Sequence, residues 1–161
     1  MALTATLSKY KKKTYLIYML LCIVVAGILA YDGYLSKYEW SHRYSFYQKH
    51  VIDKSGIPDS DMVFNQKAPP YLVGTAVLLG AYLFVMRNKK ITAEETGLVI
   101  DGKINIAYDS IEKIDKTIFD SKGRFIIIYK DAGGKETNRV ISDKDYDNLP
   151  AILDHLVAKI S

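Results

Sequence analysis

Cysteine and histidine are scarce in this chain of 161 residues, which contains one cysteine and three histidines. The single cysteine, Cys22, excludes an intramolecular disulfide and any paired-cysteine motif. The motifs Gly-x-Ser-x-Gly and His-Glu-x-x-His are absent, and the Gly133-Gly134 pair lacks the downstream Lys-Ser/Thr of a phosphate-binding loop. The sequence therefore predicts a protein that is not an enzyme, and we expect no catalytic residue, cofactor or resident metal.

Charge is missing from two long stretches, Thr14 to Tyr31 and Ala68 to Met86. A helix rises about 1.5 Å per residue and must cover roughly 30 Å of hydrocarbon, so each run is just long enough to cross a bilayer. We expect membrane-spanning helices over 14–31 and 70–86, the second begun by Pro69 and Pro70. A buried helix of a soluble core is the alternative for each run. Small residues at helical spacing, Ala26 and Ala30 in one run and Ala76 and Gly80 in the other, allow the two helices to pack on each other or on another subunit.

A cleaved signal peptide is a second alternative for the first run, because a basic segment precedes an apolar one. The run is long for a signal sequence, and Ile28 and Ala30 form a poor small-x-small cleavage site. The interpretation with two spans is therefore favoured.

Basic residues border the two runs on sides that a hairpin would bring together. Residues 1–13 carry four lysines and no acid, and Arg87, Lys89 and Lys90 follow the second run. Positive residues mark the cytoplasmic side of a span. We therefore expect 1–13 to be a basic cytoplasmic tail, residues 32–69 to be extracytoplasmic, and both termini to be cytoplasmic. The net charge of +4 is explained at the membrane edge, so nucleic-acid binding is not expected.

Aromatic residues crowd the first half of the connecting segment 32–69. Only one glycine and no proline interrupt 31–51, which predicts that the first helix continues beyond the bilayer with an aromatic surface. Tyrosine and tryptophan are enriched at protein interfaces. The candidate partner-interface residues are Tyr38, Trp40, Tyr44, Phe46 and Tyr47. A belt at the lipid head groups is the alternative for Tyr31 and Tyr34. We expect a turn or a helix cap at 55–61 and irregular coil at 62–68.

Glu39 and His42 have the Glu-x-x-His spacing of helical di-iron sites. Such a site needs a second copy of the motif and further glutamates, and this chain has no other. A metal at Glu39 and His42 would therefore require ligands from other subunits.

The C-terminal part, 87–161, alternates apolar and polar residues between turn sequences. Asp101-Gly102 and Asp131 to Gly134 are hairpin turn signals, and 91–142 predicts five or six short antiparallel strands. A closing helix is expected from about Asp147, whose side chain would cap it, with Leu149, Ile152, Leu153, Leu156, Val157 and Ile160 forming one apolar stripe. We expect His155 to be solvated beside Asp154.

This part resembles the bacterial pleckstrin-homology-like (PH-like) domains found next to membrane spans. The resemblance rests on Ile91 to Leu98, Ile106 to Ile114, the strand from Gly123 to Tyr129 and the closing helix, and covers a little under half of the chain. It implies a bent antiparallel sheet or partial barrel closed by the C-terminal helix, in a protein of the bacterial cytoplasmic membrane, and it implies no reaction. The predicted fold class is thus a membrane α-helical hairpin plus an α+β PH-like domain of antiparallel strands.

Two functions agree with these features. The first is a non-catalytic accessory, scaffold or assembly subunit of a larger membrane protein complex, with other membrane subunits as partners and homo-oligomers allowed. The second is a sensor or adaptor whose PH-like domain binds a peptide or a lipid head group. Residues 91–161 hold ten basic and thirteen acidic residues, so they form no general anion-binding surface. Lys113, Lys116, Lys122 and Arg124 could form a local patch. We favour the accessory subunit.

Overall fold

The computed structural model describes residues 2–160. The chain forms two compact units: Thr14–Phe84, and a second unit that combines the N-terminal segment up to Lys13 with the residues from Val85 onward. The second unit is therefore discontinuous in sequence, since the first is inserted into it.

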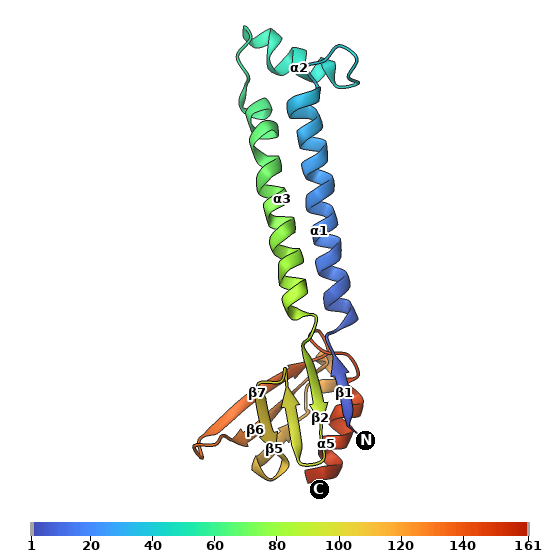
Figure 1. Ribbon diagram of the computed structural model, residues 1–161, viewed down its shortest axis with the longest axis vertical. Helices are drawn as coiled ribbons and strands as arrows, with labels where there is room; N and C mark the ends of the chain where they lie inside the picture. Colours follow the sequence, from blue (N-terminus) through green and yellow to red (C-terminus); the bar gives the residue numbers. More distant parts are fainter. Residues whose placement is uncertain (1, 161) are drawn as a thin grey trace. The chain divides into compact units, whose positions relative to one another are not determined.

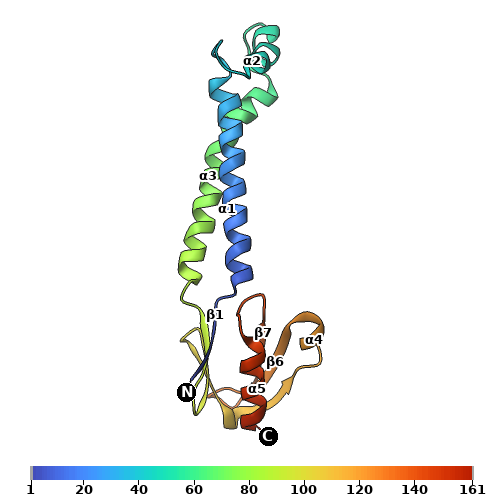
Figure 2. The same ribbon diagram turned by 90° about the vertical axis from the view of Figure 1, so that its right-hand side faces the viewer.

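The first unit consists of two long helices and the segment that joins them. Helix α1 spans Lys9–Ala30 and passes into a π-helical turn, Tyr31–Leu35; helix α3 spans Ser60–Met86. Between them lie the short helix α2, Tyr44–His50, and a 3₁₀ turn at Ile52–Lys54. Both long helices are long and apolar enough to cross a membrane. They lie side by side in opposite directions (Figures 1 and 2).

Three of the four small residues noted at helical spacing, Ala26, Ala76 and Gly80, are closely packed. Ala26 and Ala76 are each only 4% exposed, and a Cβ built on Gly80 would lie 3.4 Å from Met19 Sδ. Tyr15 and Tyr82 stack with ring centroids 5.0 Å apart. Of the two packing alternatives for these small residues, the structure has the helices packed on each other.

Two local predictions for the joining segment are wrong. The aromatic segment is not a continuation of α1, because the chain turns after Leu35 and resumes a helix only at Tyr44. The stretch 62–68 is not coil, because α3 begins at Ser60 and runs through Pro69 and Pro70. The helix begins earlier than expected because Asp59 Oδ1 accepts the free amides of Asp61 and Met62, both at 3.1 Å.

The second unit contains two antiparallel sheets in its described residues. One has the order β1-β2-β3-β4 and the other the order β5-β6-β7. The strands are β1 Leu3–Thr6, β2 Lys90–Ala93, β3 Gly97–Ile100, β4 Ile104–Ala107, β5 Ile111–Asp115, β6 Arg124–Lys130 and β7 Glu136–Ser142. The expected hairpin turns are present: Asp101 and Gly102 adopt φ values of 55° and 66° between β3 and β4, and the Asp131 amide donates to the Lys135 carbonyl at 2.9 Å.

Strand β1 comes from the segment expected to be a basic tail. Leu3 to Thr6 pair with Ala93 to Lys90 of β2, and Leu7 forms a bridge with Tyr146. In Figure 1 β1, in blue, lies beside β2. Ala5 and Leu7 are 0% and 1% exposed, so the strand completes the core. The alternation of Leu3, Ala5 and Leu7 is too short to predict a strand by itself, and the four lysines that follow it favour a basic tail instead.

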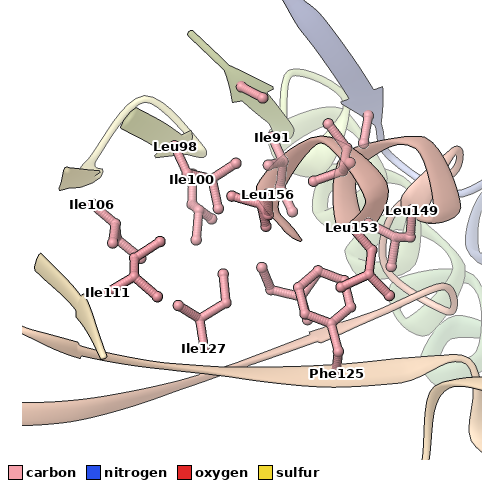
Figure 3. Packing of buried hydrophobic residues seen from close by; sticks show 14 of the residues in the cluster. Ile91, Leu98, Ile100, Ile106, Ile111, Phe125, Ile127, Leu149, Leu153 and Leu156 are labelled. Atoms are coloured by element: carbon pink, nitrogen blue, oxygen red, sulfur yellow. The ribbon is translucent and has the colours of Figure 1, made fainter. Parts of the chain in front are cut away.

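The core lies between the two sheets and is closed by helix α5, Leu149–Ile160. Figure 3 shows Leu149, Leu153 and Leu156 between Ile91 and Ile100 of one sheet and Phe125 and Ile127 of the other. The apolar stripe predicted for this helix is therefore confirmed at Leu149, Ile152, Leu153 and Leu156, which are buried.

The side chain of Asp147 does not cap α5. Its Oδ2 accepts the amide of Lys9 at 3.1 Å, at the start of α1, and its own amide donates to the Thr6 carbonyl at 2.9 Å. The Ser8 amide donates to the Asp145 carbonyl at 2.9 Å. The loop between β7 and α5 therefore holds the segment that joins β1 to α1, a long-range pairing that local sequence could not indicate.

Candidate functional site

The five predicted interface residues divide into two groups. Tyr38 and Trp40 lie in the turns after the π-helical segment, where their rings stack with centroids 5.6 Å apart, and they are 43% and 68% exposed. Tyr44, Phe46 and Tyr47 lie in α2 and are half-buried. The structure thus presents one exposed aromatic pair, and uses the other three rings mainly for packing within the segment.

An ion pair fixes the base of this aromatic segment. Arg43 donates from Nε and Nη2 to the two carboxylate oxygens of Asp32, each at 2.8 Å. The Asp32 side chain is only 10% exposed, whereas that of Arg43 is 51% exposed and lies over the Phe46 ring. The hydrogen bond to Asp32 raises the pKa of Arg43, so the guanidinium stays charged. Local sequence patterns do not indicate this pair, because its members lie eleven positions apart and the segment 32–69 has no net charge.

A second polar junction lies where the prolines interrupt the hydrogen bonds of α3. Pro69 and Pro70 have no N–H, so the carbonyls of Asn65 and Gln66 lose their helical donors. Tyr34 Oη donates to the Gln66 carbonyl at 2.6 Å, and Gln66 Nε2 donates to the Gly33 carbonyl at 3.1 Å. A Cβ at Gly33 would lie 2.6 Å from the Asn65 carbonyl oxygen, so only glycine allows this approach. The prolines thus free an acceptor that joins α3 to the π-helical turn.

Glu39 and His42, the candidate metal ligands, are both exposed. Within residues 2–160, a different set, His50, Asp59 and Asp61, brings three potential ligand atoms within 4.8 Å of one another. His50 Nδ1 lies 2.7 Å from Asp59 Oδ2 and 3.8 Å from Asp61 Oδ2. The backbone hydrogen bond from Met62, followed by the contact with His50, lowers the pKa of Asp59. Helix capping and a charged hydrogen bond account for this cluster without a metal.

In the second unit, an open hollow of about 850 Å³ lies beside the turn at Gly123. Among its lining residues, Lys122, Arg124 and Lys144 are balanced by Asp120, Asp143 and Asp147. Of the predicted basic patch, Lys113 and Lys116 do not line it. Basic and acidic side chains are equal in number in this lining, so net charge does not attract an anion to the hollow.

His155 is not solvated as expected. Its ring is half-buried and packs edge-on against Tyr108 at 6.1 Å between centroids, and its Nε2 is buried without a hydrogen-bond partner among the described residues. The Tyr108 hydroxyl donates to the Glu94 carbonyl at 2.8 Å. The contact shown for the His155 ring is therefore aromatic packing on Tyr108.

No protein-family model, curated protein or solved structure matches this chain. The candidate site therefore rests on its own geometry: an exposed aromatic pair, the Asp32–Arg43 ion pair at the base of its segment, and a polar junction at two prolines.

Proposed function

We propose that this chain is a two-span integral membrane protein that serves, without catalysis, as an accessory or assembly subunit of a larger membrane complex. The carrying observation is the insertion of both apolar helices between two paired strands, β1 and β2. Thr6 is opposite Lys90 in that pair, so the ends of the inserted segment are tied together. Both ends must then lie on one side of any membrane that the segment enters.

This constraint supports a hairpin with two crossings rather than one. It also argues against a cleaved leader, because cleavage after the first helix would remove Ala5 and Leu7 from the core. The basic residues at the two ends favour the cytoplasmic side. The outer surfaces of the helices agree with lipid contact, since Leu20, Leu78 and Val85 are 61%, 72% and 74% exposed.

The second unit supports the PH-like resemblance. Sheets of four and three strands enclose one core, and a C-terminal helix closes it. We propose that this unit is a PH-like domain interrupted by the membrane hairpin, located with both termini at the inner face of a bacterial cytoplasmic membrane. At that face it serves recognition or assembly. Its hollow combines opposite charges in equal number, which does not support a general anion-binding role.

Tyr38 and Trp40 are the proposed contact with a partner subunit on the opposite side. A stacked pair with large exposed area supplies apolar surface at little conformational cost, which is typical of interface hot spots. Their turn is held at its base by the Asp32–Arg43 pair, so the rings are presented by a supported segment.

Gentle solubilisation of native membranes, followed by native mass spectrometry, tests the proposal. The tagged full chain is expected to come with other membrane proteins in fixed stoichiometry, and Trp40→Ala to lower the bound fraction at least about ten-fold. Ile57→Ala is the matched control, because Ile57 is 69% exposed in the same joining segment. Recovery of the chain alone, or equal loss in both variants, would refute the proposed interface.

A further inference from the structure

An open groove of about 610 Å³ runs along one face of α1 and ends at the Asp32–Arg43 pair. Its apolar lining residues, Val24, Gly27, Ile28 and Tyr31, share a helical face because they are three or four positions apart. The surface is open at Gly27, since a Cβ built there would meet nothing within 4 Å. The groove is therefore a shallow, open apolar face of α1, on which Val24 and Ile28 are 49% and 57% exposed, with a charged group at one end.

The charged end keeps hydrogen-bonding capacity for a ligand. A guanidinium has five N–H donors, and the pair with Asp32 uses one on Nε and one on Nη2. The Arg43 side chain remains 51% exposed. Arginine suits phosphate because its planar fork matches two oxygens at once. Asp32 holds the guanidinium in place and neutralises its charge, so the site selects for hydrogen-bond geometry rather than for net charge.

The depth of the pair agrees with the level of lipid phosphates. The uncharged run from Thr14 to Tyr31 has eighteen residues, which as a helix cover about 27 Å, close to the thickness of the hydrocarbon layer. Asp32 follows that run directly, so in a membrane the pair lies at the boundary between acyl chains and head groups.

We propose that this groove binds one phospholipid, with an acyl chain along Val24, Gly27 and Ile28 and its phosphate accepting hydrogen bonds from Arg43. This inference rests on the membrane insertion proposed above. A phospholipid matches both parts of the site, because one molecule combines a flexible apolar chain with an anionic acceptor. A second transmembrane helix matches it less well, since it would cover the exposed guanidinium without providing an acceptor for it.

Native mass spectrometry of the delipidated full chain in detergent tests this site. The added probes are palmitoyl-oleoyl phosphatidylglycerol, the corresponding phosphatidylethanolamine, and the diacylglycerol with the same two chains. Gly27→Leu fills the groove while keeping the ion pair. Gly74→Leu is the matched control, because Gly74 lies in α3 and its Cβ position is equally open. Arg43→Lys keeps a positive charge beside Asp32 and removes the fork.

We expect the unaltered chain and Gly74→Leu to retain one molecule of either phospholipid, and to retain diacylglycerol at least about ten-fold less well. Gly27→Leu and Arg43→Lys should each weaken phospholipid retention by about ten-fold or more. Equal retention by Gly27→Leu and Gly74→Leu would show non-specific annular lipid and overturn the site. Equal retention of diacylglycerol would overturn the phosphate contact.

Alkaline carbonate extraction of the same membranes separates this inference from the proposed function. Release of the chain by carbonate overturns both, because the chain would then not span the membrane. A chain that stays in the membrane but shows no difference between the two leucine variants overturns only the lipid site.

Discussion

Replacing residues 8–88 by a two-residue Asn-Gly turn is expected to give a soluble domain, whereas residues 87–161 alone are not expected to fold stably. Leu7 and Lys89 face each other at the end of the β1–β2 pair, where the Leu7 amide donates to the Lys89 carbonyl at 3.1 Å. A two-residue type I′ turn joins strands in this arrangement. The comparison isolates the contribution of β1 to the fold.

The magnitude follows from the side chains that β1 buries. Leu7 and Ala5 are almost fully buried, and their burial is worth about 1.5–3 kcal/mol for the leucine and ~0.8 kcal/mol for the alanine methyl. Removing β1 also exposes part of Ile91 and Ala93 in β2, which are 0% and 1% exposed, at a further cost of about 1–2 kcal/mol. The total of about 3–6 kcal/mol compares with roughly 4–12 kcal/mol for a domain of this size.

Circular dichroism during urea and thermal unfolding measures the difference. At about 4–8 °C per kcal/mol, the fragment 87–161 should melt about 12–48 °C below the joined protein or be unfolded. Within the joined protein, Leu7→Ala should cost about 2–5 kcal/mol, and Thr6→Ala, at the neighbouring exposed position, less than about 0.5 kcal/mol. Equal melting of the fragment and the joined protein would refute a structural role for the N-terminal strand.

Three further predictions concern the inserted segment. Tyr34→Phe should destabilise the full chain by about 1 kcal/mol in a detergent unfolding assay, because the Gln66 carbonyl loses its donor. In a Pro70→Ala background the Gln66 carbonyl regains a helical donor, so Tyr34→Phe should no longer destabilise the chain. Additive effects of the two substitutions in the double-mutant cycle would contradict the shared acceptor. Gly33→Ala should destabilise the same chain by more than about 1 kcal/mol, because its Cβ would meet the Asn65 carbonyl oxygen at 2.6 Å. The control Gly27→Ala should be neutral or slightly stabilising. Similar stability changes in the two variants would refute the close approach at Gly33. The pKa of Asp59 is lowered from 3.8 in the folded state, so its contribution to stability is complete above pH 3.8 and is lost as the pH falls through the folded-state pKa. In that acid range, hydrogen exchange at the Asp61 and Met62 amides should accelerate. The Asp59→Asn variant should show no such acid transition.

Local sequence patterns were sufficient for those elements whose stability is local. The two uncharged runs predicted two long apolar helices, the Asp101-Gly102 pair predicted the β3–β4 turn, and the spacing of Leu149, Ile152 and Leu156 predicted the buried stripe of α5. In each case the chemistry lies within a few residues: continuous apolarity, a positive φ that glycine accepts, or a period of 3.6.

Predictions failed where a hydrogen-bond or charge partner comes from a segment that is distant in the sequence. Pro69 and Pro70 predict a helix start, yet α3 continues through them because Tyr34 pairs with one of the carbonyls that the prolines free. Asp147 predicts a cap for α5, yet it accepts the amide of Lys9 instead. Asp32 and Arg43 look like two solvated charges of a neutral segment until the π-helical turn and the following chain reversal bring them within 2.8 Å.

The sequence by itself determined the composition of the two parts: uncharged helices bordered by lysine and arginine, and an alternating region followed by an amphipathic helix. Only the tertiary structure decided that β1 and Leu7 belong to one core with the strands from β2 onward and α5. A four-residue strand has too little apolar surface to form alone or to stand out in a pattern, and becomes stable only when β2 supplies its hydrogen bonds and Tyr146 covers Leu7. That pairing, between residues more than eighty positions apart, is what makes the apolar hairpin an insertion within a domain.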